Sequence, residues 1–176
     1  MNPFMTDSAD DINHLFDSIA QDILINDEPS KAIITNINLT GETEDRSIHT
    51  LERIEQGDLI TYQDEHYLAI VEVVTKRHSK YKSLIRHCNY DIPVSSRKSV
   101  PAIVTDKTFS INETHQIRIG NGQIFVAVAD TDDNRNTFEK NEIFEFMHGN
   151  WKIIHRDFTQ RGLITLLFES TSTPAE

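Results

Sequence analysis

Eight histidines and one cysteine are the side chains of this sequence best able to bind a metal or to act as a base or nucleophile. No two histidines have the spacing of a metal-binding helix, and no His-X-Glu motif accompanies a pair of cysteines. His87 and Cys88 are adjacent, so on a strand they point to opposite faces and cannot form a base–nucleophile pair directly. We expect Cys88 to be a buried free thiol and expect no metal site. The histidines are His14, His49, His66, His78, His87, His115, His148 and His155.

Other catalytic and cofactor-binding motifs are absent from the sequence. It contains no Gly-X-Ser-X-Gly elbow, phosphate-binding loop or dinucleotide fingerprint. Asp130, Asp132 and Asp133 offer carboxylates for calcium, but no helix–loop–helix frame surrounds them. A solvated acidic loop over residues 131–136 is the simpler interpretation. We therefore predict no catalytic residue and no cofactor, and we do not expect an enzyme.

The composition favours β structure in a protein made in a reducing compartment. Hydrophobic residues make up 38% of the 176 residues, and Ile, Val, Thr, Phe and Tyr are frequent. The single cysteine excludes an intrachain disulfide and a multi-cysteine zinc site. No apolar run approaches the roughly 18 residues of a membrane span, and the first residues lack the pattern of a signal peptide. We expect a soluble protein synthesised in the cytoplasm.

Charge is unevenly distributed along the chain. Residues 1–70 carry 15 acidic and 3 basic side chains, whereas residues 71–100 carry 2 acidic and 7 basic ones. The acidic total, −11, argues against general nucleic-acid binding but allows a local basic strip. The run KRHSKYK, residues 76–82, is either a solubilising hairpin tip or a contact with DNA phosphates or an acidic neighbouring subunit. Its candidate contact residues are Lys76, Arg77, Lys80 and Lys82.

The first 29 residues are predicted to form an arm and a helix. The segment INHLFDSIAQDILI, beginning at residue 12, has apolar residues at steps of three and four, as one stripe of a helix requires. Asp10 or Asp11 is a suitable N-cap. This helix either lies on its own domain or docks on a neighbouring subunit, and its candidate inter-subunit residues are Ile12, Leu15, Phe16 and Ile19.

The remaining pattern predicts two β units joined by a linker. The first unit is expected over residues 30–93, the linker over 94–101, the second unit over 102–170 and a tail over 171–176. The linker prediction rests on PVSSRKSVP, which is bounded by prolines and rich in serine. The fold class is thus mainly β, with an N-terminal α-helix followed by two similar small antiparallel β-barrel or β-sandwich units.

The similarity of the two units is visible in the residues. GDLITYQDEHYLAIVEVV in the first half and NEIFEFMHGNWKIIHRDF in the second both have a short strand, a tight turn and a returning strand that opens on an aromatic residue. Tyr67 matches Trp151, and KSLI at 82–85 matches GLIT at 162–165. AIITNIN is matched with IFVAVAD in front of these hairpins. Duplication explains the pattern, although convergence of two ordinary hairpins would explain some of it.

These residues resemble a family of structural proteins of tailed bacteriophages that infect low-GC Gram-positive bacteria. The resemblance rests on GDLITYQDEHYLAIVEVV…YKSLIRHCNYDI, above all on RHCNY at 86–90. A second set of matching segments includes GNGQIFVAVADTDDNR and WKIIHRDFTQRGLITLLFE. The similarity extends over nearly all of residues 12–170. Its motifs are structural, and it supplies no catalytic residues.

The resemblance implies a virion protein of the head–tail junction, such as a head-closure, stopper or adaptor-like ring subunit that retains packaged DNA and docks the tail. The implied partners are further copies of the chain in a ring, the portal or adaptor and tail proteins, and packaged DNA, with no membrane. Tail-terminator and baseplate proteins are alternatives. A virion-associated carbohydrate- or receptor-binding β module, with Tyr67, Phe146 and Trp151 lining a groove, is a further one.

Overall fold

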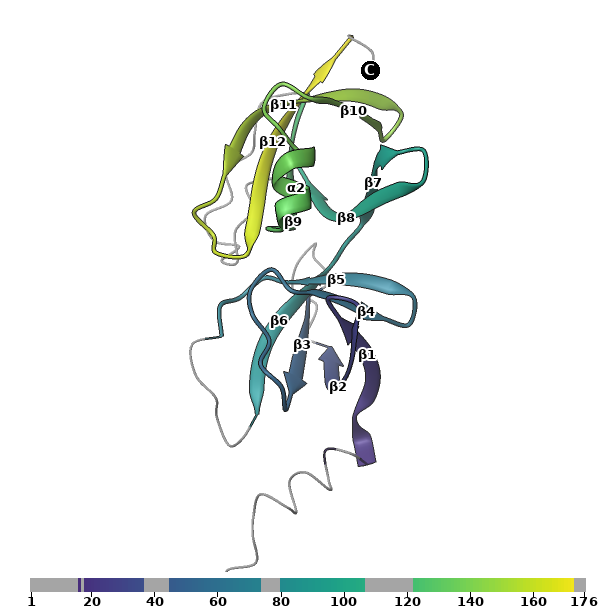
Figure 1. The fold of residues 1–176 in the computed structure, drawn as a ribbon, viewed down its shortest axis with the longest axis vertical. Coiled ribbons are helices and arrows are strands. Elements are labelled where there is room, and N and C mark those ends of the chain that lie inside the picture. The colour runs from purple at the N-terminus through teal and green to yellow at the C-terminus, as the bar shows by residue number, and fades with distance from the viewer. Residues whose placement is uncertain (1–15, 17, 37–44, 74–79, 107–121, 173–176) are drawn as a thin grey trace, which may run out of the picture.

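The computed structural model describes residues 16, 18–36, 45–73, 80–106 and 122–172. Within these ranges the protein is mainly β, and two six-stranded β units lie one above the other along the long axis of the molecule (Figure 1). The prediction of a mainly β protein built from two small antiparallel units is confirmed.

The first unit is a closed barrel with the strand order β1-β2-β3-β6-β5-β4. Its interior is filled by a cluster that includes Ile48, Ile60, Tyr67 and Ile85. Closing the sheet leaves no unpaired strand edge between its first and last strands. The strands are β1 (Gln21–Ile25), β2 (Glu28–Asn36), β3 (Asp45–Thr50), β4 (Leu59–Tyr62), β5 (Glu65–Ala69) and β6 (Tyr81–His87).

The second unit is a six-stranded sheet with the order β10-β11-β12-β9-β8-β7. A short helix, α2 (Asp132–Thr137), precedes β10, and Phe138 directly after it is fully buried in the core of this unit. The strands are β7 (Tyr90–Ser95), β8 (Lys98–Thr105), β9 (Gln123–Ala129), β10 (Ile143–Phe146), β11 (Gly149–Asp157) and β12 (Leu163–Thr171).

Both units have the same topology. In each, two three-stranded meanders are joined through their third strands: β3 pairs with β6 in the first unit, and β9 pairs with β12 in the second. The predicted repeat is therefore confirmed at the level of topology, with Tyr67 on β5 and Trp151 on the equivalent β11. The match of AIITNIN with IFVAVAD is wrong, because residues 32–36 lie in β2 and residues 124–129 in β9, and the equivalent of β9 is β3.

The units differ in how they close. In the first, β1 pairs with β4 through Leu24 and Thr61 and through Ile25 and Ile60. In the second, the equivalent strands β7 and β10 are the two ends of the sheet, and among the described strands they do not pair with each other. Pro93 lacks a backbone N–H and sits in β7, where an edge strand tolerates proline. The second unit consequently has two free edges, on β7 and β10, whereas the corresponding edges of the first unit pair with each other.

A third apolar cluster joins the two units. Leu68, Ile70 and Cys88 of the first unit pack with Ile103, Ala127 and Leu163 of the second, and all six are buried. Because these side chains face the other unit, separating the two units would expose apolar surface on both.

Two glycines bring the backbones of the units into direct contact beside this cluster. Gly57, before β4, and Gly162, before β12, have φ angles of +91° and +79°. A Cβ atom on Gly57 would lie 1.7 Å from the carbonyl oxygen of Gly162, and a Cβ atom on Gly162 would lie 1.8 Å from that of Gln56. Both positions therefore need glycine for its conformation and for its size.

The predicted N-terminal helix is wrong at its C-terminal end. Residues 21–25 form β1, in which Ile23 points into the barrel, because pairing with β2 and β4 closes the sheet. The described residues before β1 include one helical hydrogen bond, donated by Ala20 N–H to the carbonyl of Phe16 at 2.8 Å. Most of the predicted arm, residues 1–15, lies outside the described residues.

The structure also moves the boundary between the units. Residues 94–101, expected to be a linker, lie in the β7–β8 hairpin of the second unit, where Val100 is buried in the core. The chain passes from one unit to the other at residues 88–89, between β6 and β7. The first unit begins at β1 rather than at residue 30. A serine-rich and proline-bounded segment here forms a hairpin because its apolar residues have a core to enter.

Replacing Gly57 or Gly162 by alanine should lower the free energy of unfolding by more than about 3 kcal/mol, because backbone atoms must move to admit the methyl group. Gly122→Ala is the matched control. Its φ is also positive, at +81°, but the nearest atom is the mobile hydroxyl of Ser170 at 3.1 Å, so the loss should be about 1 kcal/mol. Urea denaturation measures these free energies of unfolding. Equal losses in the three variants would contradict the close backbone contact between Gly57 and Gly162.

Candidate interaction surface

The histidines do not form a metal site in the part of the chain that the structure describes. No group of three or more His, Cys, Asp and Glu side chains there could hold a metal ion. His66 Nδ1 lies 3.1 Å from Thr61 Oγ1, and His87 Nε2 lies 2.6 Å from a carboxylate oxygen of Glu65. His14, His78 and His115 lie outside the described residues.

The three aspartates at positions 130, 132 and 133 form ion pairs around α2 instead of converging on one point. Arg135 donates two hydrogen bonds to Asp130, at 2.6 and 2.8 Å, and these lower the pKa of that carboxyl. Lys98 pairs with Asp133. The segment predicted as a loop is helical because the Thr131 hydroxyl accepts a hydrogen bond from Asn134 N–H at 3.1 Å and caps the helix.

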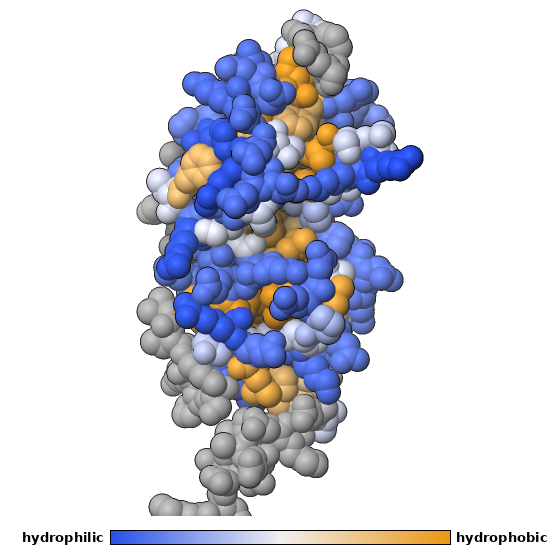
Figure 2. Space-filling view, in the orientation of Figure 1, coloured by the Kyte–Doolittle hydropathy of each residue, from blue (hydrophilic) through white to orange (hydrophobic). Residues whose placement is uncertain are grey.

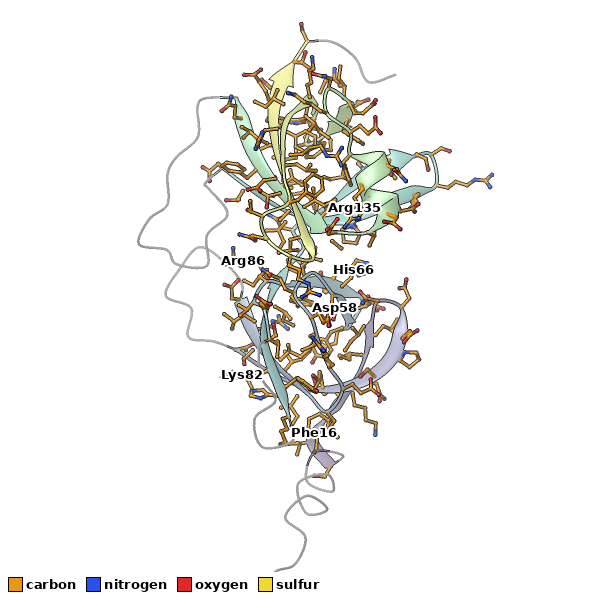
Figure 3. The ribbon with its side chains drawn as sticks, turned by 60° about the vertical axis from the view of Figure 1, so that its left-hand side comes forward. Phe16, Asp58, His66, Lys82, Arg86 and Arg135 are labelled. Carbon is orange, nitrogen blue, oxygen red and sulfur yellow. The ribbon has the colours of Figure 1, made fainter. Side chains whose placement is uncertain are left out.

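The RHCNY segment forms the junction between the two units (Figure 3). Arg86, only 7% exposed, donates two hydrogen bonds to Asp45 on the neighbouring β3, at 2.6 and 2.8 Å. Asn89 bonds both backbone groups of Val104: its amide donates to the carbonyl at 2.9 Å, and its side-chain oxygen accepts from the N–H at 2.7 Å. Each unit is thus attached to the junction by a bidentate side chain.

Cys88 is buried at this junction, as predicted. Burial, with a smaller contribution from Asp91, raises the pKa of its thiol to about 12. The adjacent His87 is directed to Glu65 and meets the edge of the Tyr67 ring. A buried thiol that stays protonated at neutral pH is a packing group.

A basic strip lies on the outside of the first barrel. We use this name for Lys80, Lys82 and His49, the last of which lies directly opposite Lys82 on the neighbouring strand. Burial lowers the pKa of His49, and the charges of Lys82 and Lys80 lower it further, so the two lysines carry the charge of the strip at neutral pH. Figure 3 shows Lys82 pointing outward. The other two predicted contact residues, Lys76 and Arg77, lie outside the described residues.

The residues predicted to form an inter-subunit helix differ in their exposure to solvent. Phe16 is 1% exposed and lies at the end of the first barrel, with Lys80 Nζ 5.4 Å from the centre of its ring (Figure 3). It is buried within its own chain, so the prediction that it contacts a neighbouring subunit is wrong. Ile19 is 54% exposed and is free to make such a contact. Ile12 and Leu15 lie outside the described residues.

A groove follows the unpaired edges of the second unit and was not predicted from the sequence. We call it the seam groove. It has a volume of about 1,030 Å³ and carries two carboxylates, Glu142 and Glu145, while no lysine or arginine lines it. Its walls come from residues 90 and 93–95 on the β7 side, 136–137 of α2 and 142–148 around β10.

The seam groove offers few aromatic faces to a sugar. Phe144 and Phe146 line it but are only 8% and 7% exposed. Trp151 packs against Phe146 and donates its indole N–H to the carbonyl of that residue at 3.0 Å, whereas Tyr67 is in the core of the other unit. The three aromatics proposed for a carbohydrate site therefore do not share a surface.

Hydrophilic side chains cover most of the face shown in Figure 2, with smaller apolar patches in both units. A second hollow, of about 240 Å³, lies between the units and is lined by arginines and carboxylates in equal number. Two of these arginines already have partners, since Arg53 pairs with Glu55 and Arg135 with Asp130. This hollow has no net charge to select a ligand.

Comparison with known proteins relates the first unit to a phage family. Residues 2–87 match the family model described as the YomX N-terminal domain. The match covers just under half of the chain and ends at the last residue of β6, where the first barrel ends. Because this is a phage-type family, the match supports a phage-associated protein. No curated protein and no solved structure matches the chain significantly. Among the described residues, no helix has the length and apolar character needed to cross a membrane.

Cys88 should react slowly with a thiol reagent in the native protein. With a pKa of about 12, only about one thiol in ten thousand is ionised at pH 8. We expect Ellman's reagent to label the native protein at least about 100-fold more slowly than the urea-unfolded protein. Similar rates in the two states would show that the junction is open to solvent.

Lys82→Glu should raise the pKa of His49, because it removes a positive charge that opposes protonation of the ring. Titration of the imidazole signals by NMR measures this pKa. Glu28→Lys, an exposed charge change in the same barrel, should leave it unchanged. If the pKa of His49 were the same in the Lys82 variant as in the wild type, the two side chains would not be close enough to form the basic strip.

Proposed function

We propose that the protein is a structural subunit of a phage virion at the head–tail junction, acting in a head-closure, stopper or adaptor-like ring that retains packaged DNA and docks the tail. The phage-type family match supports a virion-related role. The position at the neck is inferred from the resemblance of the RHCNY segment and its neighbouring strands to tailed-phage structural proteins. The role needs no catalysis and no cofactor.

The observation that carries this proposal is the repetition of one six-stranded topology within a single joined body. The shared cluster of Leu68, Ile70 and Leu163 with its neighbours fixes one barrel against the other. A neck protein must hold two neighbouring assemblies at a fixed separation, and a pair of joined β units supplies one surface for each. The same pair could instead widen a single ring.

The basic strip gives the subunit a means of contacting DNA or an acidic neighbour. Lys82 is exposed, and Lys80 is half-buried over Phe16. Lysine side chains on a surface attract phosphates without reading sequence, as a protein that only retains packaged DNA requires. The continuing segment contains the predicted contact residues Lys76 and Arg77.

Electron microscopy of a lysate from a phage that lacks this gene tests the proposed position. Emptied heads beside finished, unattached tails are the expected result, because the subunit would be missing when DNA must be retained and the tail received. DNA-filled heads with missing or aberrant tails would move the protein to a tail-terminator or baseplate role. Normal infectious particles would refute a structural role.

Reversing the charge of Lys76, Arg77, Lys80 and Lys82 together should reduce the yield of infectious particles by about tenfold or more, because an assembly contact would become repulsive. The purified variant should remain folded by circular dichroism. The matched control is Glu28→Lys, which changes an exposed charge on β2. Normal yield from the quadruple variant would exclude the strip from assembly.

A further inference from the structure

The seam groove contains two carboxylates, Glu142 and Glu145. Neither Glu142 nor Glu145 forms an ion pair with any described residue, and Glu145 is exposed. They lie beside apolar surface, since Tyr90 and Met147 in the same groove are 39% and 37% exposed. A hollow with unpaired negative charge, exposed apolar side chains and unpaired strand edges is suited to a protein partner that carries positive charge.

The basic strip presents the complementary surface. Lys82 is exposed and has no acidic partner among the described residues. His49 lies opposite Lys82 on β3, and burial, followed by the charges of Lys82 and Lys80, lowers the pKa of its ring. Ile33 lies opposite His49 on β2 and is half-buried, which adds apolar area beside the charge.

The two surfaces cannot meet within one molecule. The basic strip is on β3 and β6, on the left of the lower unit in Figure 1, whereas β7 and β10 lie on the right of the upper unit. Figure 3 keeps Lys82 on the left and the hairpin of β7 on the right after a turn of 60°. Because the shared cluster holds the units together, the strip and the groove stay on opposite sides.

We propose that the seam groove of one copy receives the basic strip of a second copy. Lys82 and Lys80 of the second copy then neutralise Glu145 and Glu142 of the first, and Tyr90 and Met147 are covered. The contact joins two different surfaces, so it is heterologous and continues from copy to copy, closing into a ring if the rotation permits. This inference rests on the proposed homo-oligomeric role and specifies the surfaces that would carry it.

Charge reversal on each surface provides the test. Sedimentation velocity of the wild-type protein should show concentration-dependent association that weakens when the salt is raised to about 0.5 M, because short-range screening weakens exposed ion pairs. Lys82→Glu and Glu145→Lys should each weaken association by about tenfold, since each places like charges in contact. Glu28→Lys is the matched control and should associate as the wild type does.

A mixture of the two reversed variants distinguishes a direct contact from a general charge effect. The glutamate introduced at position 82 of one variant faces the lysine introduced at position 145 of the other, while the native groove of the first faces the native strip of the second. An equimolar mixture should therefore associate more strongly than either variant alone. Failure of the mixture to associate would overturn the proposed pairing.

Three other outcomes would also overturn the proposal. One is a wild-type protein that stays monomeric at all concentrations tested. Another is self-association that both charge-reversed variants retain. This result would be compatible with a ring, but its subunits would meet through a different surface. The third is binding of duplex DNA that Lys82→Glu abolishes while self-association is unchanged, which would assign the strip to DNA. The lysate microscopy described above tests the neck position independently, so the interface and the position can fail separately.

Discussion

The backbone contact between Gly57 and Gly162 is the constraint on which the arrangement of the protein depends. At this point no side-chain atom separates the two barrels, because a Cβ atom at either position would overlap a carbonyl group. The close approach lets Leu68, Ile70, Ile103 and Leu163 form a core that belongs to neither barrel alone. Each fully buried aliphatic side chain contributes about 1.5–3 kcal/mol, which is substantial for units of this size. RHCNY completes the junction, with Arg86 held by β3 and Asn89 held by β8.

This junction turns a repeated fold into an asymmetric body. The two units share a topology, but pairing of β1 with β4 closes the first, whereas β7 and β10 leave the seam of the second unpaired. The first unit carries the exposed Lys82 and the second the exposed Glu142 and Glu145, and none of these three forms an ion pair with another described residue. Because the units are fixed, these surfaces keep a constant separation and direction. A subunit with different surfaces on opposite sides suits the directional assembly that we propose, and the family match supports a phage-associated protein.

The sequence predicts the hairpins well because their signals are local. Alternating apolar residues and tight turns define β4–β5 and β10–β11, and the aromatic positions Tyr67 and Trp151 are equivalent. The predictions are wrong where residues far apart in the sequence determine the secondary structure. Ile19, Ile23 and Leu24 fit a helical stripe, yet pairing with β2 and β4 makes residues 21–25 a strand. The seam groove has no sequence signature, because it results from a strand pair that fails to form. Thr131 ahead of two aspartates was a local signal for α2 that the acidic-loop interpretation passed over.

Differential scanning calorimetry of the intact chain tests most directly whether the two barrels form one body. If they share a core, neither can unfold while the other stays native. The protein should then show a single transition with equal calorimetric and van't Hoff enthalpies. Two resolved transitions, each with the enthalpy of a single barrel, would show that the units are independent. The fixed separation of the basic strip and the seam groove would then be lost as a basis for directional assembly.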